Sequence, residues 1–179
     1  MARRLPQLSG AERPANLVVL LREAYVALND VVFTRLAERG HGAVRPAHGA
    51  VFQYLDDTGT TVSTLAERAR MTKQAMAELV RHLEAHDYVV RVPDPGDGRA
   101  KLVLPTERGR DVVAVAQALA PALEERLADL LGAERAQALR ADLDAVRHTD
   151  WSLVGHQANE TAELPSDDRP RSRSRVTRR

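Results

Sequence analysis

Two histidines of this sequence, His82 and His86, stand four residues apart, which is the spacing of zinc ligands on one face of a helix. No third ligand lies near them, no His-Glu-x-x-His pattern occurs, and the chain contains no cysteine. The pair is therefore better interpreted as exposed polar groups on a helix, and a metal-dependent enzyme is the less favoured hypothesis. We predict a protein that is not an enzyme, with no metal, no cofactor and no catalytic residue. The lack of cysteine also excludes disulfides and thiol chemistry.

A second group of residues suits binding to nucleic acid. The only two lysines of the chain are Lys73 and Lys101, and the stretch from Thr61 to Arg110 holds nine Lys and Arg against seven Asp and Glu. The whole chain has a formal net charge of only +1, but a locally basic surface on a neutral body can still bind a duplex. Aromatic residues make up 3% of the chain, which is too few to stack the bases of a single strand.

These residues must be positioned by helices, because apolar residues recur at spacings of three and four over most of the chain. Glycines and prolines mark the ends of the helices. The predicted helices cover residues 14–39, 46–59, 62–69, 73–86, 106–131 and, after Gly132, the segment up to about 151. Thr72 is the predicted N-cap of the fourth helix. We therefore expect a mainly α-helical fold.

One stretch interrupts this helical pattern. Two β-prone runs, Tyr88–Val92 and Lys101–Leu104, flank the segment "PDPGDGRA", whose prolines and glycines cannot continue a helix. The pattern predicts a small β-hairpin with a basic tip. A short helix, a tight turn, a second helix and such a hairpin together are typical of a winged helix-turn-helix, in which the hairpin is the wing.

The physical roles of the candidate DNA-binding residues follow from this arrangement. The first turn of the second helix reaches base edges in the major groove, so Lys73 contacts bases or phosphates there and Gln74 could read adenine. Arg99 on the wing suits a narrow minor groove, and Asp97 is expected to hold an arginine in position. The predicted DNA-binding residues are Ser63, Thr64, Arg68, Thr72, Lys73, Gln74, Arg81, Arg99 and Lys101, with Asp97 as wing support.

The segment from Arg45 to Gly109 resembles the MarR family of dimeric bacterial transcription regulators. The resemblance rests on "LAERARMTKQAMAELVRHLEAHDYVVRV" followed by "DPGDGRAKLVLPTERG", which contains an acid-x-Arg wing motif and a Thr-x-x-Gly motif at the start of the next helix. Two residues depart from the family pattern. Pro105 replaces the usual leucine before Thr106, and Asp87 replaces a glycine that commonly ends the recognition helix, at a cost of roughly 1 kcal/mol.

The resemblance implies a cytoplasmic homodimer that binds a pseudo-palindromic operator on double-stranded DNA. It further implies a repressor that releases DNA when a small aromatic or phenolic ligand binds. The apolar residues of the terminal helices, among them Leu17, Leu20, Leu139 and Leu143, support a dimer independently, because a small lobe cannot cover them alone. Without base preference, the same fold would instead be a protein-interaction scaffold.

The expected domain organisation has three parts. Residues 1–13 are a flexible N-terminus, residues 14–151 a winged-helix domain, and residues 152–179 a disordered tail with six arginines after position 168. Within the domain, residues 14–39 and 106–151 are dimerisation helices and residues 45–105 the DNA-binding lobe. No stretch is long and apolar enough to span a membrane or to be a secretory signal, so we expect no membrane association.

An effector pocket is expected between the dimerisation helices and the lobe. Its candidate residues occupy similar faces of the first two helices, and plain core packing is the alternative for Tyr25 and Phe52. Surface positions are expected for both His41 and His48. The candidate ligand-binding residues are Arg22, Tyr25, Asn29, His48 and Phe52.

Overall fold

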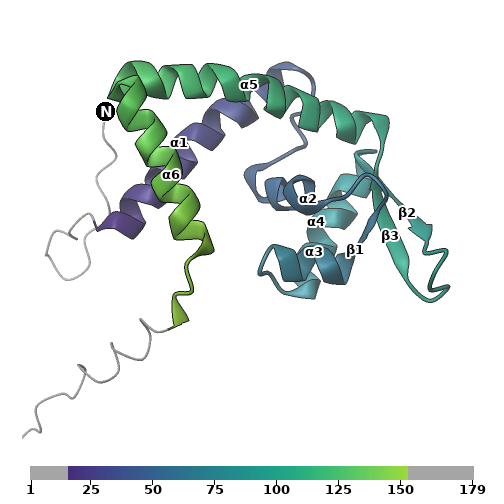
Figure 1. The fold of residues 1–179 in the computed structure, drawn as a ribbon. Helices are drawn as coiled ribbons and strands as arrows, with labels where there is room; N and C mark the ends of the chain where they lie inside the picture. Colours follow the sequence, from purple (N-terminus) through teal and green to yellow (C-terminus); the bar gives the residue numbers. More distant parts are fainter. Residues whose placement is uncertain (1–15, 153–179) are drawn as a thin grey trace, which may run out of the picture. The chain divides into compact units, whose positions relative to one another are not determined.

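The computed structural model describes residues 16–152, and its contacts divide the chain into two compact units, one up to Leu127 and one from Ala128. The fold is mainly α-helical with one small antiparallel sheet, as predicted (Figure 1). None of the helices in this described part is long and apolar enough to cross a membrane. In chain order the elements are α1 (Leu17–Glu38), η1 (Pro46–His48), α2 (Gly49–Tyr54), β1 (Thr60–Thr61), α3 (Val62–Arg68), α4 (Lys73–Ala85), β2 (Val89–Pro93), β3 (Lys101–Pro105), α5 (Glu107–Leu131) and α6 (Ala133–His148).

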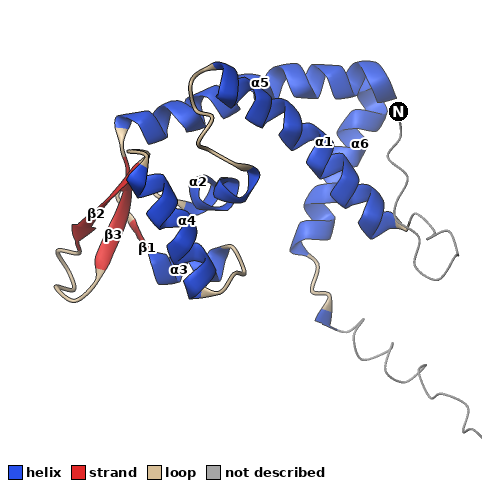
Figure 2. Ribbon diagram, turned by 180° about the vertical axis from the view of Figure 1, so that it is seen from behind, coloured by secondary structure: helices blue, strands red, loops and turns tan. Residues whose placement is uncertain are grey.

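The sheet has the strand order β1-β3-β2, and both pairings are antiparallel (Figure 2). Strands β2 and β3 form the predicted hairpin, in register from Val89 opposite Pro105 to Pro93 opposite Lys101. Strand β1 was not predicted, because two residues are too short to show a period-2 pattern. It pairs Thr60 with Val103, so the segment before α3 is held on the edge of the hairpin.

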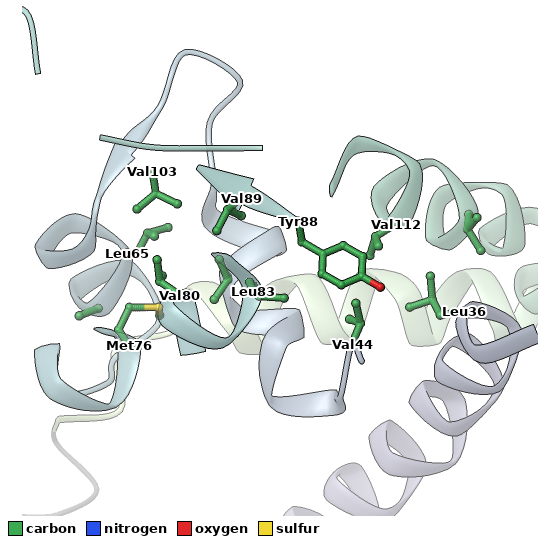
Figure 3. Close-up of a cluster of buried hydrophobic side chains, with 13 residues drawn as sticks. Leu36, Val44, Leu65, Met76, Val80, Leu83, Tyr88, Val89, Val103 and Val112 are labelled. Carbon is green, nitrogen blue, oxygen red and sulfur yellow. The ribbon is translucent and has the colours of Figure 1, made fainter. Parts of the chain in front are cut away.

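A hydrophobic core lies beneath the helix-turn-helix and the hairpin (Figure 3). Met76, Val80 and Leu83 follow one face of α4 and are fully buried, as the helical period requires. Each such side chain contributes about 1.5–3 kcal/mol by leaving water. The buried apolar residues are Leu36, Val44, Val51, Leu65, Ala66, Met76, Val80, Leu83, Tyr88, Val89, Val103, Val112 and Val115.

Threonine caps fix the starts of both helices in the helix-turn-helix. The hydroxyl of Thr61 accepts a hydrogen bond from the amide of Thr64, and the hydroxyl of Thr72 accepts one from the amide of Ala75, 3.2 Å away. The prediction of Thr72 as an N-cap is confirmed. Each cap gives an unpaired first-turn amide a partner, which sets where α3 and α4 begin.

Several helix boundaries were predicted wrongly. Helix α1 starts at Leu17 and not at residue 14, because the side chain of Asn16 caps it through the amide of Val19. The predicted helix over residues 46–59 is the short η1 and α2, which end at Tyr54 because the following residue is extended. Helix α6 ends at His148, three residues before the predicted end.

Most apolar residues of α1 are exposed in the single chain, although their spacing predicted an inward face. Only Leu36 is buried, whereas Leu17 and Leu20 remain 69% and 53% exposed. In the second unit, α6 contains no buried residue, and Leu143 is 41% exposed. Each unit therefore carries apolar surface that its own residues leave uncovered.

Candidate nucleic-acid interface

The first turn of α4 presents its polar side chains to solvent. Lys73 and Gln74 are both exposed there, and Arg81 is exposed two turns further along. Their orientation follows from the opposite face of α4, which is buried in the core. The positive end of the helix dipole and the free amides of this turn add to the attraction for an anion.

The tip of the wing is held by two aspartates that bind backbone amides. The carboxylate of Asp94 accepts a hydrogen bond from the amide of Gly96 at 2.8 Å, and that of Asp97 accepts one from the amide of Arg99 at 3.0 Å. Asp97 therefore fixes the backbone of Arg99, and its predicted role of holding an arginine in position for DNA stays a prediction. In the described part of the chain the guanidinium of Arg99 has no acidic partner, and its side chain is exposed.

The cations around the lobe fall into two groups. Arg68 and Arg91 are held by acids: the guanidinium of Arg68 lies 2.7 Å from Asp56, and that of Arg91 lies 3.5 Å from Glu84. The remaining group has no ion pair with any acid among residues 16–152. Its members are Arg45, Arg70, Lys73, Arg81, Arg99 and Lys101, all exposed, and the last four are predicted DNA contacts.

Arg68 is a brace for α3. Its guanidinium donates to the carboxylate of Asp56 and, at 2.9 Å, to the carbonyl of Tyr54. Two hydrogen bonds hold the pKa of the Asp56 carboxyl below its ordinary value: the one from Arg68 has the larger effect, and the one from the hydroxyl of Thr60 the smaller. The predicted DNA contact of Arg68 remains a prediction, and the guanidinium that would make this contact already has two partners in the protein.

The other two candidates on α3 are half-buried. The hydroxyl of Thr64 lies 2.9 Å from the hydroxyl of Thr61, which itself caps α3. Ser63 precedes it in the first turn. Their predicted contacts with the DNA backbone stay predictions, and Thr64 shares its hydroxyl with the cap.

The Thr-x-x-Gly motif forms the junction between the lobe and α5. The hydroxyl of Thr106 donates to the carbonyl of Asp87 at 2.6 Å and accepts from the amide of Gly109 at 3.1 Å. Asp87 has a φ of +60°, the left-handed conformation expected for a position where the family has glycine. Pro105 is buried and pairs with Val89 at the end of the hairpin.

His86 is exposed as predicted, whereas three other histidines are not. His41 and His48 are buried, 5% and 4% exposed, although surface positions were expected. His82 is half-buried; its ring stacks on that of His48 at 4.6 Å and lies tilted against that of His86 at 4.3 Å. The pKa of His48 is lowered to about 4, mainly because the ring is buried. The positive charges that His82, Arg45 and His86 can carry lower this pKa further. Residues 16–152 contain no group of three or more His, Cys, Asp or Glu side chains that could hold a metal ion.

The five candidate ligand-binding residues are not gathered into one site within the described chain. On α1, Arg22 pairs with its neighbour Glu23, and Tyr25 is 64% exposed. In the lobe, His48 stacks on His82, and Phe52 makes an edge contact with the ring of Tyr88 at 6.5 Å. Asn29, on α1, is half-buried. The core interpretation fits Phe52, whereas Tyr25 lies on the surface.

A second cluster, at the start of α5, was missed by the sequence-based reasoning. The guanidinium of Arg108 lies over the ring of Tyr88, 4.8 Å from its centre, and donates to the Tyr88 hydroxyl and to the carbonyl of Gly40. His41 lies 2.8 Å from the carboxylate of Asp111. These pairs are separated by 20 to 70 residues, so no local pattern could have found them.

Together, the capped helix pair, the three-stranded sheet and the exposed cations define a winged helix-turn-helix protein. Residues 44–100 match the family model described as the MarR family. Over these residues the lobe matches the MarR family, the class of transcription regulators that its motifs resemble. No curated protein sequence matches the chain.

Solved structures of MarR-type regulators share the fold. The transcriptional repressor CouR bound to a 23-mer DNA duplex is 23% identical, with a TM-score of 0.61 over 80% of this chain and 100% of that chain. CouR from Rhodococcus jostii RHA1 bound to p-coumaroyl-CoA is 23% identical, with a TM-score of 0.58 over 76% and 94% of the two chains. A point mutant of MepR from S. aureus is 20% identical, with a TM-score of 0.56 over 73% and 96%.

Proposed function

We propose that this protein is a sequence-specific regulator of transcription that binds double-stranded DNA as a homodimer and acts as a repressor. Helix α4 reads the major groove, and the wing enters the adjacent minor groove or contacts the backbone. The relatives with the same fold are transcription regulators, and one of them is bound to a DNA duplex. The mechanism needs no covalent chemistry.

The observation that carries this proposal is the distribution of cations on the lobe. Arg68 and Arg91 are paired with acids, whereas Lys73 at the start of α4 and Arg99 and Lys101 on the wing are exposed and unpaired within residues 16–152. Exposed cations without a protein partner are free to replace the counterions of a duplex. They lie on the two elements that a winged helix inserts into DNA.

The homodimer is supported by the apolar surface of α1 and α6. Leu17 and Val18 on α1 and Leu139 and Leu143 on α6 are each at least 38% exposed, which is unusual for so many large apolar residues on terminal helices. A second copy of the chain would cover such surface. Two lobes related by a two-fold axis would then address half-sites about 34–36 Å apart, on a pseudo-palindromic operator.

Relief of repression by a small aromatic or phenolic ligand completes the proposal. CouR, which has the same fold, is seen with p-coumaroyl-CoA bound. On this chain, Tyr25 and Arg22 of α1 are exposed and Asn29 is half-buried, so these side chains can contribute to a pocket completed in the dimer. His48 and Phe52 would contribute less, because both already have ring partners.

The first test compares two duplexes over a range of salt concentrations: the natural sequence upstream of the gene, and a scrambled version of it. The full chain should bind the natural duplex tightly at physiological salt, whereas its binding to the scrambled duplex should be lost at that salt concentration. Arg99→Ala should weaken specific binding by about 1–3 kcal/mol. The matched control is Arg35→Ala, which removes the same charge from α1, where Arg35 pairs with Glu38.

Equal and steeply salt-dependent binding to both duplexes would contradict the proposal. That result would favour the alternative of an interaction scaffold without specific DNA binding. Deleting residues 165–179, the arginine-rich end that lies outside the described residues, would then show how much of the binding is due to that segment.

A further inference from the structure

Helix α4 is attached to the rest of the chain by a side-chain contact on its inner side. His82 lies one residue beyond Arg81, on the side of α4 that faces the protein, and its Nε2 lies 3.0 Å from the carbonyl oxygen of Ala43. Ala43 belongs to residues 40–48, which we call the linker, between α1 and α2. A carbonyl can only accept, so Nε2 of His82 carries the proton and donates it.

The ring of His82 is also fixed by stacking. It lies nearly parallel to the ring of His48, at the other end of the linker, with the ring centres 4.6 Å apart and an angle of 13° between the planes. His48 is itself oriented, because its Nδ1 accepts a hydrogen bond from the amide of Arg45 at 2.9 Å. His82 is therefore held at two points of the linker, by Ala43 and by His48.

The linker is in turn anchored on α5. His41 lies 2.8 Å from the carboxylate of Asp111, and Arg108 donates to the carbonyl of Gly40 at 3.1 Å. The linker also has its own internal bond, from the amide of Val44 to the carbonyl of His41. A continuous series of contacts thus runs from α5 through the linker to the middle of α4.

We propose that His82 is a positioning residue for DNA recognition, which fixes the register of α4 against the linker and, through the linker, against α5. The proposal rests on the proposed function of α4 as the reading helix. His82 itself does not touch DNA, because it lies on the inner side of α4 and its Nε2 is hydrogen-bonded to the carbonyl of Ala43. It sets where the exposed side chains of Lys73, Gln74 and Arg81 stand relative to the groove.

Three variants of the full chain separate positioning from simple stability. His82→Phe keeps a flat ring against His48 and removes the donor to Ala43, whereas His82→Gln keeps an N–H donor. The matched control is His86→Phe, which keeps a ring beside His82 and removes the hydrogen bond between Nδ1 of His86 and the carbonyl of His82 within the same helix. For each variant we would measure the ratio of affinities for an operator duplex, selected from a random pool, and a scrambled duplex.

A misplaced reading helix should lose specific contacts and keep the salt-dependent phosphate contacts. We expect the ratio to fall about tenfold or more in His82→Phe, with binding of the scrambled duplex unchanged, because a lost base contact costs about a factor of ten. In His82→Gln the ratio should stay within about threefold of wild type, because the side chain keeps a donor for the Ala43 carbonyl. The same is expected of His86→Phe, which leaves both contacts of His82 with the linker in place. An unchanged ratio in His82→Phe, or an equal loss in His86→Phe, would overturn the proposal.

Hydrogen exchange tests the same inference without DNA. In the His82→Phe variant, the linker amides of Val44 and His48 should exchange about tenfold faster than in wild type. In the His86→Phe variant, the same two amides should exchange at the wild-type rate. If wild type binds both duplexes alike, the proposed function fails, and the exchange measurement alone decides about His82. Unchanged exchange in His82→Phe would then refute its positioning role.

Discussion

Gly109 lies directly against the backbone carbonyl of Tyr88, so closely that a β-carbon at position 109 would overlap with the Tyr88 oxygen. This contact lets the first turn of α5 approach the end of the helix-turn-helix, where the amide of Thr106 also binds the Tyr88 carbonyl at 3.1 Å. The glycine of the Thr-x-x-Gly motif is therefore required by close packing at this junction. A backbone atom cannot move aside as a flexible side chain could.

Replacing this glycine should destabilise the protein. We expect Gly109→Ala to lower the free energy of unfolding by about 2–3 kcal/mol, because the overlap forces α5 away from the lobe. Chemical denaturation measures the change. Gly42→Ala is the matched control, since a β-carbon there meets no atom within 4 Å, and it should change stability by less than about 0.5 kcal/mol. Equal effects of the two substitutions would contradict the packing argument.

The left-handed residue after α4 offers a gain in stability. Asp87 has a φ of +60°, which glycine adopts without steric cost. We expect Asp87→Gly to raise the free energy of unfolding by about 0.5–1 kcal/mol, while the carbonyl that accepts from Thr106 is retained. Glu78→Gly, in the interior of α4, should have the opposite sign and lower stability by about 1 kcal/mol. A loss of stability in both variants would argue against the conformational explanation.

The brace between Arg68 and Asp56 can be tested by titration. Arg68→Met should raise the pKa of the Asp56 carboxyl toward its ordinary value, because the hydrogen bond from Arg68 is the largest cause of its lowering. Thr60→Val, which removes the second hydrogen bond, should raise it less. Carboxyl carbon shifts followed by NMR give both values. Asp144, which pairs with Arg147 in α6, is the internal reference, and its pKa should not change in either variant. An unchanged pKa of Asp56 in Arg68→Met would mean that Arg68 does not lower it.

The buried histidine of η1 should make stability depend on pH. The pKa of His48 is about 4 in the folded chain and about 6.5 when unfolded, so the unfolded chain binds more protons between these values. Stability should therefore fall by up to about 3 kcal/mol as the pH is lowered from 6.5 to 4, with no further loss from His48 below 4.

A single substitution isolates this contribution. His48→Asn keeps an acceptor near the amide of Arg45 but does not titrate, so the difference in unfolding free energy between wild type and variant should change across this pH range. Denaturant titrations at intervals between pH 7 and pH 4 provide the measurement. A difference that stays constant with pH would show that His48 does not carry the effect.

Local patterns in the sequence were enough to predict α4 and the wing of the lobe. The cap at Thr72, the apolar period of α4 and the proline-rich turn of the wing each depend on residues within a few positions of one another, and all three are found in the structure. The same holds for the left-handed conformation at Asp87, which the family pattern indicated. These features are decided by backbone preferences and hydrogen bonds to near neighbours.

Contacts between distant residues could not be predicted in this way. His48 and His82 are 34 positions apart and look like surface polar groups in their own segments, yet their rings stack on each other. Arg68 carries the same charge as Arg81, and only the fold shows that Asp56 holds the first while the second is unpaired within residues 16–152. Whether a cation is free depends on which acid the fold brings within reach.

The sequence by itself determined the class of fold, the place of the wing and the two elements that carry the candidate DNA contacts, because helix periods, caps and turns are local properties. The tertiary structure decided which of those side chains are unpaired within residues 16–152, which glycine packs directly against a backbone carbonyl and how the linker connects α5 to α4. Those outcomes depend on side chains that meet only after the chain has folded, since burial and pairing are set by neighbours in space and not in sequence.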